Sequence, residues 1–225
     1  MAVPAYFYPG SYWTQLDHAH PPLQLAVVNP GSGPERSRDP RYAGVVRAAQ
    51  AAGITVVGYV NTNYARRSLS AVKADIDVYY RWYDVNGIFF DQASTACSHE
   101  PYYADLNRYA KAKRGVARTI LNPGTQTNQC YVHAADILLT FEDSDSEYLH
   151  SYSAPPWVAR YSPSHFWHVI YAALTVAAMA HAVKLGRQRQ AGFVYVTQAG
   201  LPNPYSRLPT GAYWTNELAD IEASP

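Results

Sequence analysis

The sequence predicts a single α/β domain over residues 1–225, in which eight strand–helix units close into a (β/α)8 TIM-like barrel. Short apolar runs recur along the chain, and most are followed by a turn and then by a helix-compatible segment. The runs lack strict polar alternation, which is typical of strands buried on both faces of a parallel sheet. The length of 225 residues is compatible with such a barrel, for which ~250 residues is typical. A doubly wound open sheet is the alternative, but the segment "YFYPGSYW" is not the Gly-rich phosphate loop that this fold typically carries after its first strand.

Each element follows from a local signal. The expected strands are, in chain order, residues 5–9, 23–30, 54–60, 87–91, 117–123, 136–142, 166–172 and 192–198. The expected helices are residues 41–53, which end in Gly; 68–85, which begin with a Ser cap; 101–115, which open with Pro and close with Gly; 173–186; and 211–224. The helical signal is weak after the fifth and sixth strands.

Composition and charge exclude several classes of protein. The formal net charge is +1, so the basic face that a nucleic-acid-binding protein needs is not expected. No stretch approaches the ~20 apolar residues of a membrane-spanning helix, and the best candidate, residues 169–183, is interrupted by polar side chains. The first ten residues show no secretory leader, which leaves a cytoplasmic location open. We expect a monomer without a cofactor.

The cysteines and histidines do not predict a metal site. Cys97 and Cys130 lack a CxxC spacing, and the sequence alone leaves open whether they form a bridge or two free thiols. The closest histidine pairs, "HAH" and "HFWH", have no acids in a recognised ligand spacing. We therefore expect no bound metal.

Polar residues collect where the predicted strands end. The carboxyl ends of all strands of such a barrel meet at one rim, where active sites are found. The candidate substrate-binding residues at this rim are Tyr6, Tyr8, Asn29, Tyr59, Thr62, Gln92, Asn122, His168 and Thr197. The chain also contains 20 tyrosines, whose rings suit stacking on sugar rings while the hydroxyl bonds to sugar oxygens.

Two acids at this rim are the candidate catalytic residues. Asp91 ends the run "GIFFD" and Glu142 ends the run "DILLTFE". Strict alternation predicts that Thr140 points inward together with Glu142. The two strands are two apart, so the carboxylates are expected to face each other across the barrel mouth. Glycoside hydrolysis needs such a pair, one protonated and one charged.

The motifs "YFYP", "VNPGSGP", "VVGYVNTNY", "WYDVNGIFFDQ", "LNPGT" and "FE" resemble, in order, those of the spherulin-4-like family, which includes glycoside hydrolase family 135 and is related to family 114. The resemblance covers about residues 5–142. It implies a secreted or cell-surface enzyme that cuts α-1,4-linked polymers of galactosamine and N-acetylgalactosamine, such as galactosaminogalactan. It also implies Asp91 as nucleophile or electrostatic stabiliser and Glu142 as general acid/base. A retaining endo-glycosidase acting on an amino-sugar polysaccharide is the resulting hypothesis.

One position departs from the family pattern. Gln92 stands where the family usually has glutamate after the aspartate. An amide neither donates a proton as an acid nor carries charge. The alternative hypothesis is therefore a catalytically silent carbohydrate-binding protein on the same fold. Under either hypothesis, a bridge between Cys97 and Cys130 would brace the rim beside Asp91.

Overall fold

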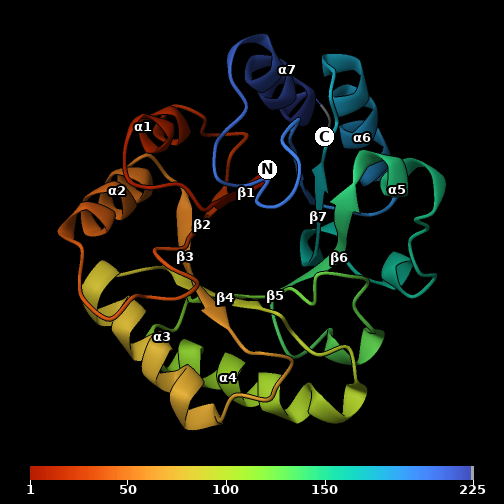
Figure 1. The fold of residues 1–225 in the computed structure, drawn as a ribbon. Coiled ribbons are helices and arrows are strands. Elements are labelled where there is room, and N and C mark those ends of the chain that lie inside the picture. Colours follow the sequence, from red (N-terminus) through yellow and green to blue (C-terminus); the bar gives the residue numbers. More distant parts are fainter. Residues whose placement is uncertain (224–225) are drawn as a thin grey trace.

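The computed structural model describes residues 1–223 and shows a ring of parallel strands surrounded by helices (Figure 1). The strands pair in chain order from β1 to β8, and β1 and β8 lie against each other, so the barrel is nearly closed. They are β1 (Ala2–Ala5), β2 (Leu25–Val28), β3 (Thr55–Asn61), β4 (Gly87–Asp91), β5 (Arg118–Leu121), β6 (Ile137–Ser144), β7 (Phe166–Tyr171) and β8 (Phe193–Val196). This arrangement confirms the predicted barrel.

Helices separate most of the strands. They are α1 (Ser11–Asp17), α2 (Pro40–Ala51), α3 (Leu69–Tyr83), α4 (Glu100–Lys113), α5 (Asp145–His150), α6 (Val176–Gln188) and α7 (Gly211–Glu222). Side-chain caps explain where several begin: Ser68, Ser144 and Thr175 each accept a hydrogen bond from a backbone N–H in the first turn. Between β5 and β6 a short 3₁₀ helix, Gln129–Tyr131, replaces an α-helix, in agreement with the weak helical signal there.

The prediction of a first strand over residues 5–9 is wrong. The strand is β1, which ends at Ala5, and the following residues leave the sheet. The ring of Phe7 packs edge-on against Tyr12 and Trp13 of α1, with centroids 5.3 and 5.9 Å away. The aromatic residues favour a strand by propensity, but their packing onto α1 fixes this segment as a loop. Helix α1 itself was not predicted, and neither was α5.

Strand β6 contains an irregularity that strict alternation did not predict. Leu139 pairs with Trp167 of β7, but the next pair is Phe141 with His168, so Thr140 is an extra residue in the ladder. The Thr140 hydroxyl lies 2.9 Å from His168 Nε2 among buried side chains on the helix side of β7. The prediction that Thr140 points inward with Glu142 is therefore wrong, and the physical reason is this β-bulge.

The described residues contain no helix long and apolar enough to cross a membrane.

Candidate active site

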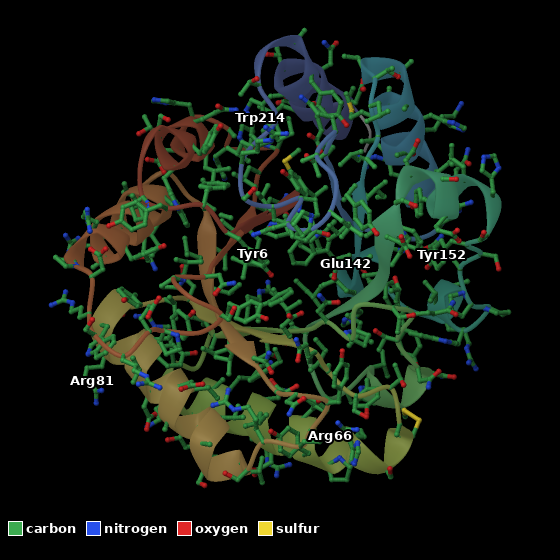
Figure 2. All side chains as sticks on the ribbon, viewed as in Figure 1. Tyr6, Arg66, Arg81, Glu142, Tyr152 and Trp214 are labelled. Atoms are coloured by element: carbon green, nitrogen blue, oxygen red, sulfur yellow. A yellow bond between two sulfur atoms is a disulfide. The ribbon has the colours of Figure 1, made fainter. Side chains whose placement is uncertain are left out.

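The two predicted acids meet at the carboxyl-terminal rim of the barrel. Asp91 is the last residue of β4, and Glu142 lies near the end of β6, two strands further on. Between them Asn122, which follows β5, donates from Nδ2 to Asp91 Oδ1 at 2.9 Å and to Glu142 Oε2 at 2.5 Å. Since one nitrogen contacts both oxygens, these oxygens are at most 5.4 Å apart, the sum of the two distances. Figure 2 shows Glu142 and Tyr6 inside the ring of strands.

Asp91 is surrounded by donors. The Tyr59 hydroxyl donates to Oδ2 at 2.5 Å, Asn122 donates to Oδ1, and the backbone N–H of Gln92 also bonds to the carboxylate. Burial raises the pKa of Asp91 above its ordinary value, while these three hydrogen bonds favour the charged form and oppose the rise. Burial and, after it, the neighbouring Asp91 carboxylate raise the pKa of Tyr59, so its phenol stays protonated and remains a donor.

Glu142 is in a less favourable place for negative charge. Burial raises its pKa, and repulsion by the nearby Asp91 raises it further. The Tyr205 hydroxyl donates to Oε1 at 2.7 Å, and with Asn122 it partly offsets this rise. Asp143 adds a further repulsion. Of the two acids, Glu142 is therefore the one that the surroundings favour in the protonated state.

Tyr205 was not predicted. It lies in the loop after β8, in "LPNPYSR", and reaches Glu142 across 63 positions of sequence. Its ring also packs edge-on against Tyr6, with centroids 5.7 Å apart. No local signal in the sequence marks this tyrosine, because its role depends on how a long loop folds back over the barrel mouth.

Three hollows meet at Glu142. The first, of about 330 Å³, is lined by both acids together with Gln92, Asn122 and Tyr64. The second, of about 320 Å³, lies between Glu142 and the loop after β8. The third, of about 180 Å³, lies on the α5 side of β6, and Phe141 and Tyr152 contribute to its wall. All three hollows have Glu142 in their lining and therefore adjoin one another along the rim, and together they are called the depression below.

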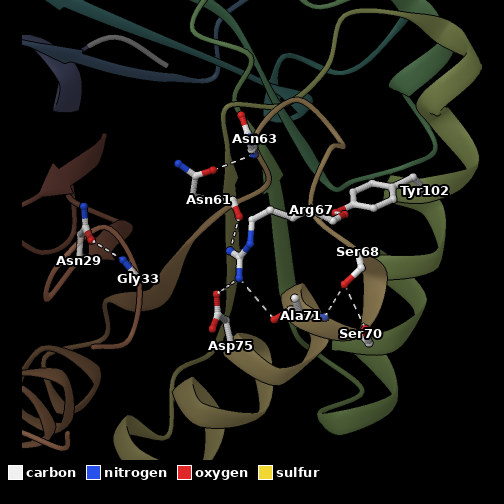
Figure 3. Close-up of polar contacts among 10 residues, drawn as sticks. All are labelled: Asn29, Gly33, Asn61, Asn63, Arg67, Ser68, Ser70, Ala71, Asp75 and Tyr102. Atoms are coloured by element: carbon white, nitrogen blue, oxygen red, sulfur yellow. Dashed lines mark hydrogen bonds and ion pairs between the residues drawn. The ribbon is translucent and has the colours of Figure 1, made fainter. Parts of the chain in front are cut away.

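Several predicted binding residues line this depression. Tyr6, Asn29 and Tyr59 line the second hollow, and Gln92 and Asn122 line the first. The Asn29 side chain also accepts a hydrogen bond from Gly33 N at 3.2 Å, which orders the loop after β2 (Figure 3). Tyr59 and Asn122 were predicted as direct substrate contacts, but their polar atoms bond to the carboxylates.

Four predicted residues do not face the hollows. Tyr8 is half exposed, and its hydroxyl donates to Asp39 at 2.6 Å on the outer surface. Thr62 is fully buried and donates to the backbone carbonyls of Asp91 and Gln92. Thr197 is buried and accepts from Ala199 N. His168 is fully buried on the helix side of β7, since alternation along this strand directs Trp167 and Val169 inward and His168 outward. These four side chains support the rim from outside the depression.

The loop after β3 is fastened to the end of β4. The Thr62 hydroxyl and Tyr64 N both donate to the Gln92 carbonyl, at 2.9 and 2.7 Å. These bonds hold Gln92 at φ 48°, a left-handed conformation that is uncommon for residues other than glycine. Figure 3 shows how Arg67 fixes the same loop by donating to the Asn61 carbonyl and pairing with Asp75.

Cys97 and Cys130 form a disulfide, with Cα atoms 5.8 Å apart. The bridge joins the loop that follows Asp91 at the end of β4 to the loop that begins with Asn122 after β5. Of the two alternatives that the sequence left open, the structure shows the bridge. Among residues 1–223 no three His, Cys, Asp or Glu side chains are grouped in a way that could hold a metal ion.

Comparisons with known proteins agree with this architecture. The model of the family described as "Spherulation-specific family 4" matches residues 1–221. Spherulin-4 of Physarum polycephalum is 38% identical over 162 residues, which are 70% of this chain and 48% of that protein. The chain thus spans about half the length of this curated relative. It belongs to spherulation-specific family 4, the family whose motifs the sequence resembles.

Solved structures share the fold. Sph3 of Aspergillus clavatus, crystallised in complex with GalNAc, is similar with a TM-score of 0.84 and 25% identity, covering 99% of this chain and 97% of Sph3. The GH18 chitinase ChiB of Flavobacterium johnsoniae is similar with a TM-score of 0.59 and 9% identity, covering 98% of this chain and 93% of ChiB. The second similarity shows the barrel alone.

Proposed function

We propose that this chain is a retaining glycoside hydrolase that cuts within α-1,4-linked polymers of galactosamine and N-acetylgalactosamine. The observation that carries the proposal is the amide of Asn122, which bonds to both Asp91 and Glu142. The two oxygens are at most 5.4 Å apart, a limit that is compatible with the ~5–5.5 Å carboxyl separation of retaining enzymes and lies below the ~6.5–9.5 Å of inverting ones.

The surroundings assign a role to each acid. Glu142 holds the proton because burial and the neighbouring Asp91 raise its pKa, so it acts as general acid. Burial raises the pKa of Asp91 too, but three hydrogen bonds favour its charged form against this rise, so we assign Asp91 the role of nucleophile. In the first step Glu142 protonates the glycosidic oxygen while Asp91 attacks the anomeric carbon, which releases the leaving sugar and forms a glycosyl ester. In the second step Glu142 takes a proton from water, the water oxygen attacks the same carbon, and Asp91 leaves as carboxylate.

Two features support an amino-sugar polymer as substrate. Sph3, which is similar over nearly its whole length, was crystallised with GalNAc. Within the part of the chain that the structure describes, no Lys or Arg lines the three hollows, whereas Asp143 and Glu147 do so in addition to the two catalytic acids. Such a lining favours neutral or cationic sugars over acidic ones.

The arrangement of the hollows supports cleavage inside a chain. Hollows extend from Glu142 toward the loop after β8 on one side and toward α5 on the other. A polymer that crosses the rim could continue beyond the cleaved bond in both directions, which is the requirement for endo action. The disulfide supports a location outside the cytoplasm as part of the proposal, because disulfides persist in oxidising compartments.

The test is the release of oligosaccharides from purified galactosaminogalactan, acetylated and chemically deacetylated. The wild type should release oligomers, and proton NMR of the first products should show the α configuration. Glu142→Gln should lower the rate by about 10²–10⁴-fold, and Asp91→Asn should abolish cleavage. No products from either polymer at any pH between 4 and 8 would refute the proposal.

The second candidate is a carbohydrate-binding protein without activity, and Gln92 favours it. Gln92 lines the same hollow as Asp91 and stands where the family resemblance predicts a glutamate. This candidate predicts that the wild type binds the polymer without cutting it and that Gln92→Glu restores cleavage. Measurable turnover by the wild type, unchanged or decreased in Gln92→Glu, excludes it.

A further inference from the structure

The extra residue in β6 determines which way Glu142 points. In a parallel pair, residues in register face the same side of the sheet. Trp167 of β7 faces the barrel interior, because its ring contacts Phe89 of β4 with centroids 5.8 Å apart. Ile170 faces the helices, since it packs with Met179 and other apolar residues of α6.

Glu142 is in register with Val169, which lies two residues after Trp167 and faces the interior. If Thr140 were an ordinary ladder residue opposite His168, every later residue of β6 would move by one position. Glu142 would then pair with Ile170 and face the helices. The bulge is therefore the feature that brings the general acid of the proposed reaction into the depression.

A buried polar cluster holds this bulge. The Thr140 hydroxyl lies 2.9 Å from His168 Nε2, and the Tyr148 hydroxyl lies 2.7 Å from His168 Nδ1. The Tyr152 hydroxyl also approaches Nε2, at 3.2 Å. Arg189 stacks over the Tyr148 ring at 4.4 Å and covers the cluster from outside.

The histidine in this cluster is neutral. It is fully buried, and burial lowers its pKa to about 3, with a smaller contribution from Arg189. A neutral imidazole has one donor and one acceptor nitrogen, and both nitrogens have hydroxyl partners here in either tautomer. The pair of His168 and Thr140 is therefore a fixed structural contact and does not titrate at neutral pH.

We propose that His168 is a positioning residue, which holds the Thr140 bulge of β6 and thereby aims Glu142 at the substrate. This inference rests on the proposed function for its kinetic consequence, but the register that it explains is independent of turnover. His168 does not line the depression, so it acts through the side chains that it contacts, which are chiefly Thr140 of β6 and also Tyr152 in the wall of the third hollow.

The test uses paired variants. Thr140→Val and His168→Leu remove the polar contact with little change in volume, whereas Thr140→Ser and His168→Gln keep a hydroxyl and a side-chain donor and acceptor. The first pair should lower kcat by about 10- to 100-fold with KM within about twofold of wild type, because a small displacement of a catalytic group has effects of this size. Thr140→Ser and His168→Gln should keep most of the wild-type kcat. Ile170→Val is the matched control, since it removes one buried methylene from β7, the strand that carries His168, but no polar contact of the cluster, and its kcat should equal that of wild type.

A second measurement does not need turnover. Titration of the Glu142 carboxyl followed by carbon-13 NMR should differ from wild type in Thr140→Val and His168→Leu and should match wild type in Thr140→Ser. A wild type that cleaves nothing refutes the proposed function and leaves this titration to decide the inference. If Thr140→Val folds and keeps both the wild-type titration of Glu142 and the wild-type pH–rate profile, His168 does not position the acid. The Thr140 pair decides the question alone if the His168 variants do not fold.

Discussion

Removing the phenol hydroxyls next to the two acids should move opposite limbs of the pH–rate profile. The reaction needs Asp91 charged and Glu142 protonated, so the rate rises with pH as Asp91 ionises and falls as Glu142 ionises. Tyr59 donates to Asp91 alone and Tyr205 to Glu142 alone. Each bond stabilises the charged carboxylate, so its removal raises the pKa of the acid that it contacts. Tyr59→Phe should move the rising limb to higher pH, and Tyr205→Phe should move the falling limb to higher pH.

The size of each movement follows from the number of bonds lost. A hydrogen bond to a charged group contributes about 1.5–3 kcal/mol, which corresponds to a factor of about 10 to 150 in the ionisation constant of the acid. Tyr59→Phe should bring the two limbs of the pH–rate profile closer together, and Tyr205→Phe should move them further apart. The shift in each case is the change in pKa that corresponds to this factor. Asn122→Ala removes one hydrogen bond from each acid and should move both limbs of the profile to higher pH.

The measurement is kcat/KM for polymer cleavage from pH 3 to 9 at constant ionic strength. Tyr8→Phe is the control, because its hydroxyl bonds to Asp39 on the outer surface and its loss should leave both limbs in place. If Tyr59→Phe moves the falling limb, or Tyr205→Phe the rising one, the assignment of the proton to Glu142 is wrong. If neither variant moves a limb, these acids do not control the reaction.

Three further predictions concern stability. Burial raises the pKa of Glu217 from an ordinary 4.5 to about 8. Between these two pH values the folded protein keeps this proton and the unfolded chain has lost it, so the free energy of unfolding falls as pH rises. Glu217→Gln should flatten this slope and stabilise the protein by about 3 kcal/mol at pH 7, measured by urea unfolding at several pH values. Replacing Cys97 and Cys130 by Ser should reduce stability by about 3–4 kcal/mol, given the sequence separation of 33, and reductant should produce the same loss in wild type but not in the double variant. Gly87→Ala should destabilise by about 1–3 kcal/mol in thermal unfolding, because its Cβ would overlap backbone atoms of Arg118, which cannot rotate away as a side chain can.

The sequence predicted the barrel well because its signals are local and repeated. The strand "GIFFD" is indicated by its apolar run, and the helix after Ser68 is indicated by its apolar periodicity and by one capping hydroxyl. The failures lie where tertiary packing decides. The segment after Ala5 has strand-like composition, but Phe7 packs onto α1 and pulls the chain out of the sheet.

The site was predicted in part for the same reason. Asp91 and Glu142 could be found because parallel strands bring their carboxyl ends to one rim. Their partners could not be assigned, since Asn122 reads equally well as a substrate contact or as a bridge until distances are known. Glu142 was expected to point inward because of its place at the rim, and strict alternation extended this direction to Thr140, yet the strand contains a bulge that alternation does not allow. Glu142 does point inward, but the reason is a contact between β6 and β7, which cannot be read from the sequence of either strand alone.

The tyrosines explain how two acids can be buried together at this rim. An unpaired carboxylate in an apolar site is strongly disfavoured, while a site open to water would not raise its pKa. Tyr59 and Tyr205 satisfy both requirements, because each ring packs edge-on against Tyr6 and fills space beside the acids, while its hydroxyl donates to one carboxylate. A leucine at either position would exclude water without satisfying the acid, and a serine would bond to the acid without filling the space. The abundance of tyrosine noted in the sequence therefore has a use at this rim beyond stacking on sugars: it allows burial to raise the pKa of both acids while each keeps a hydrogen-bond donor of its own.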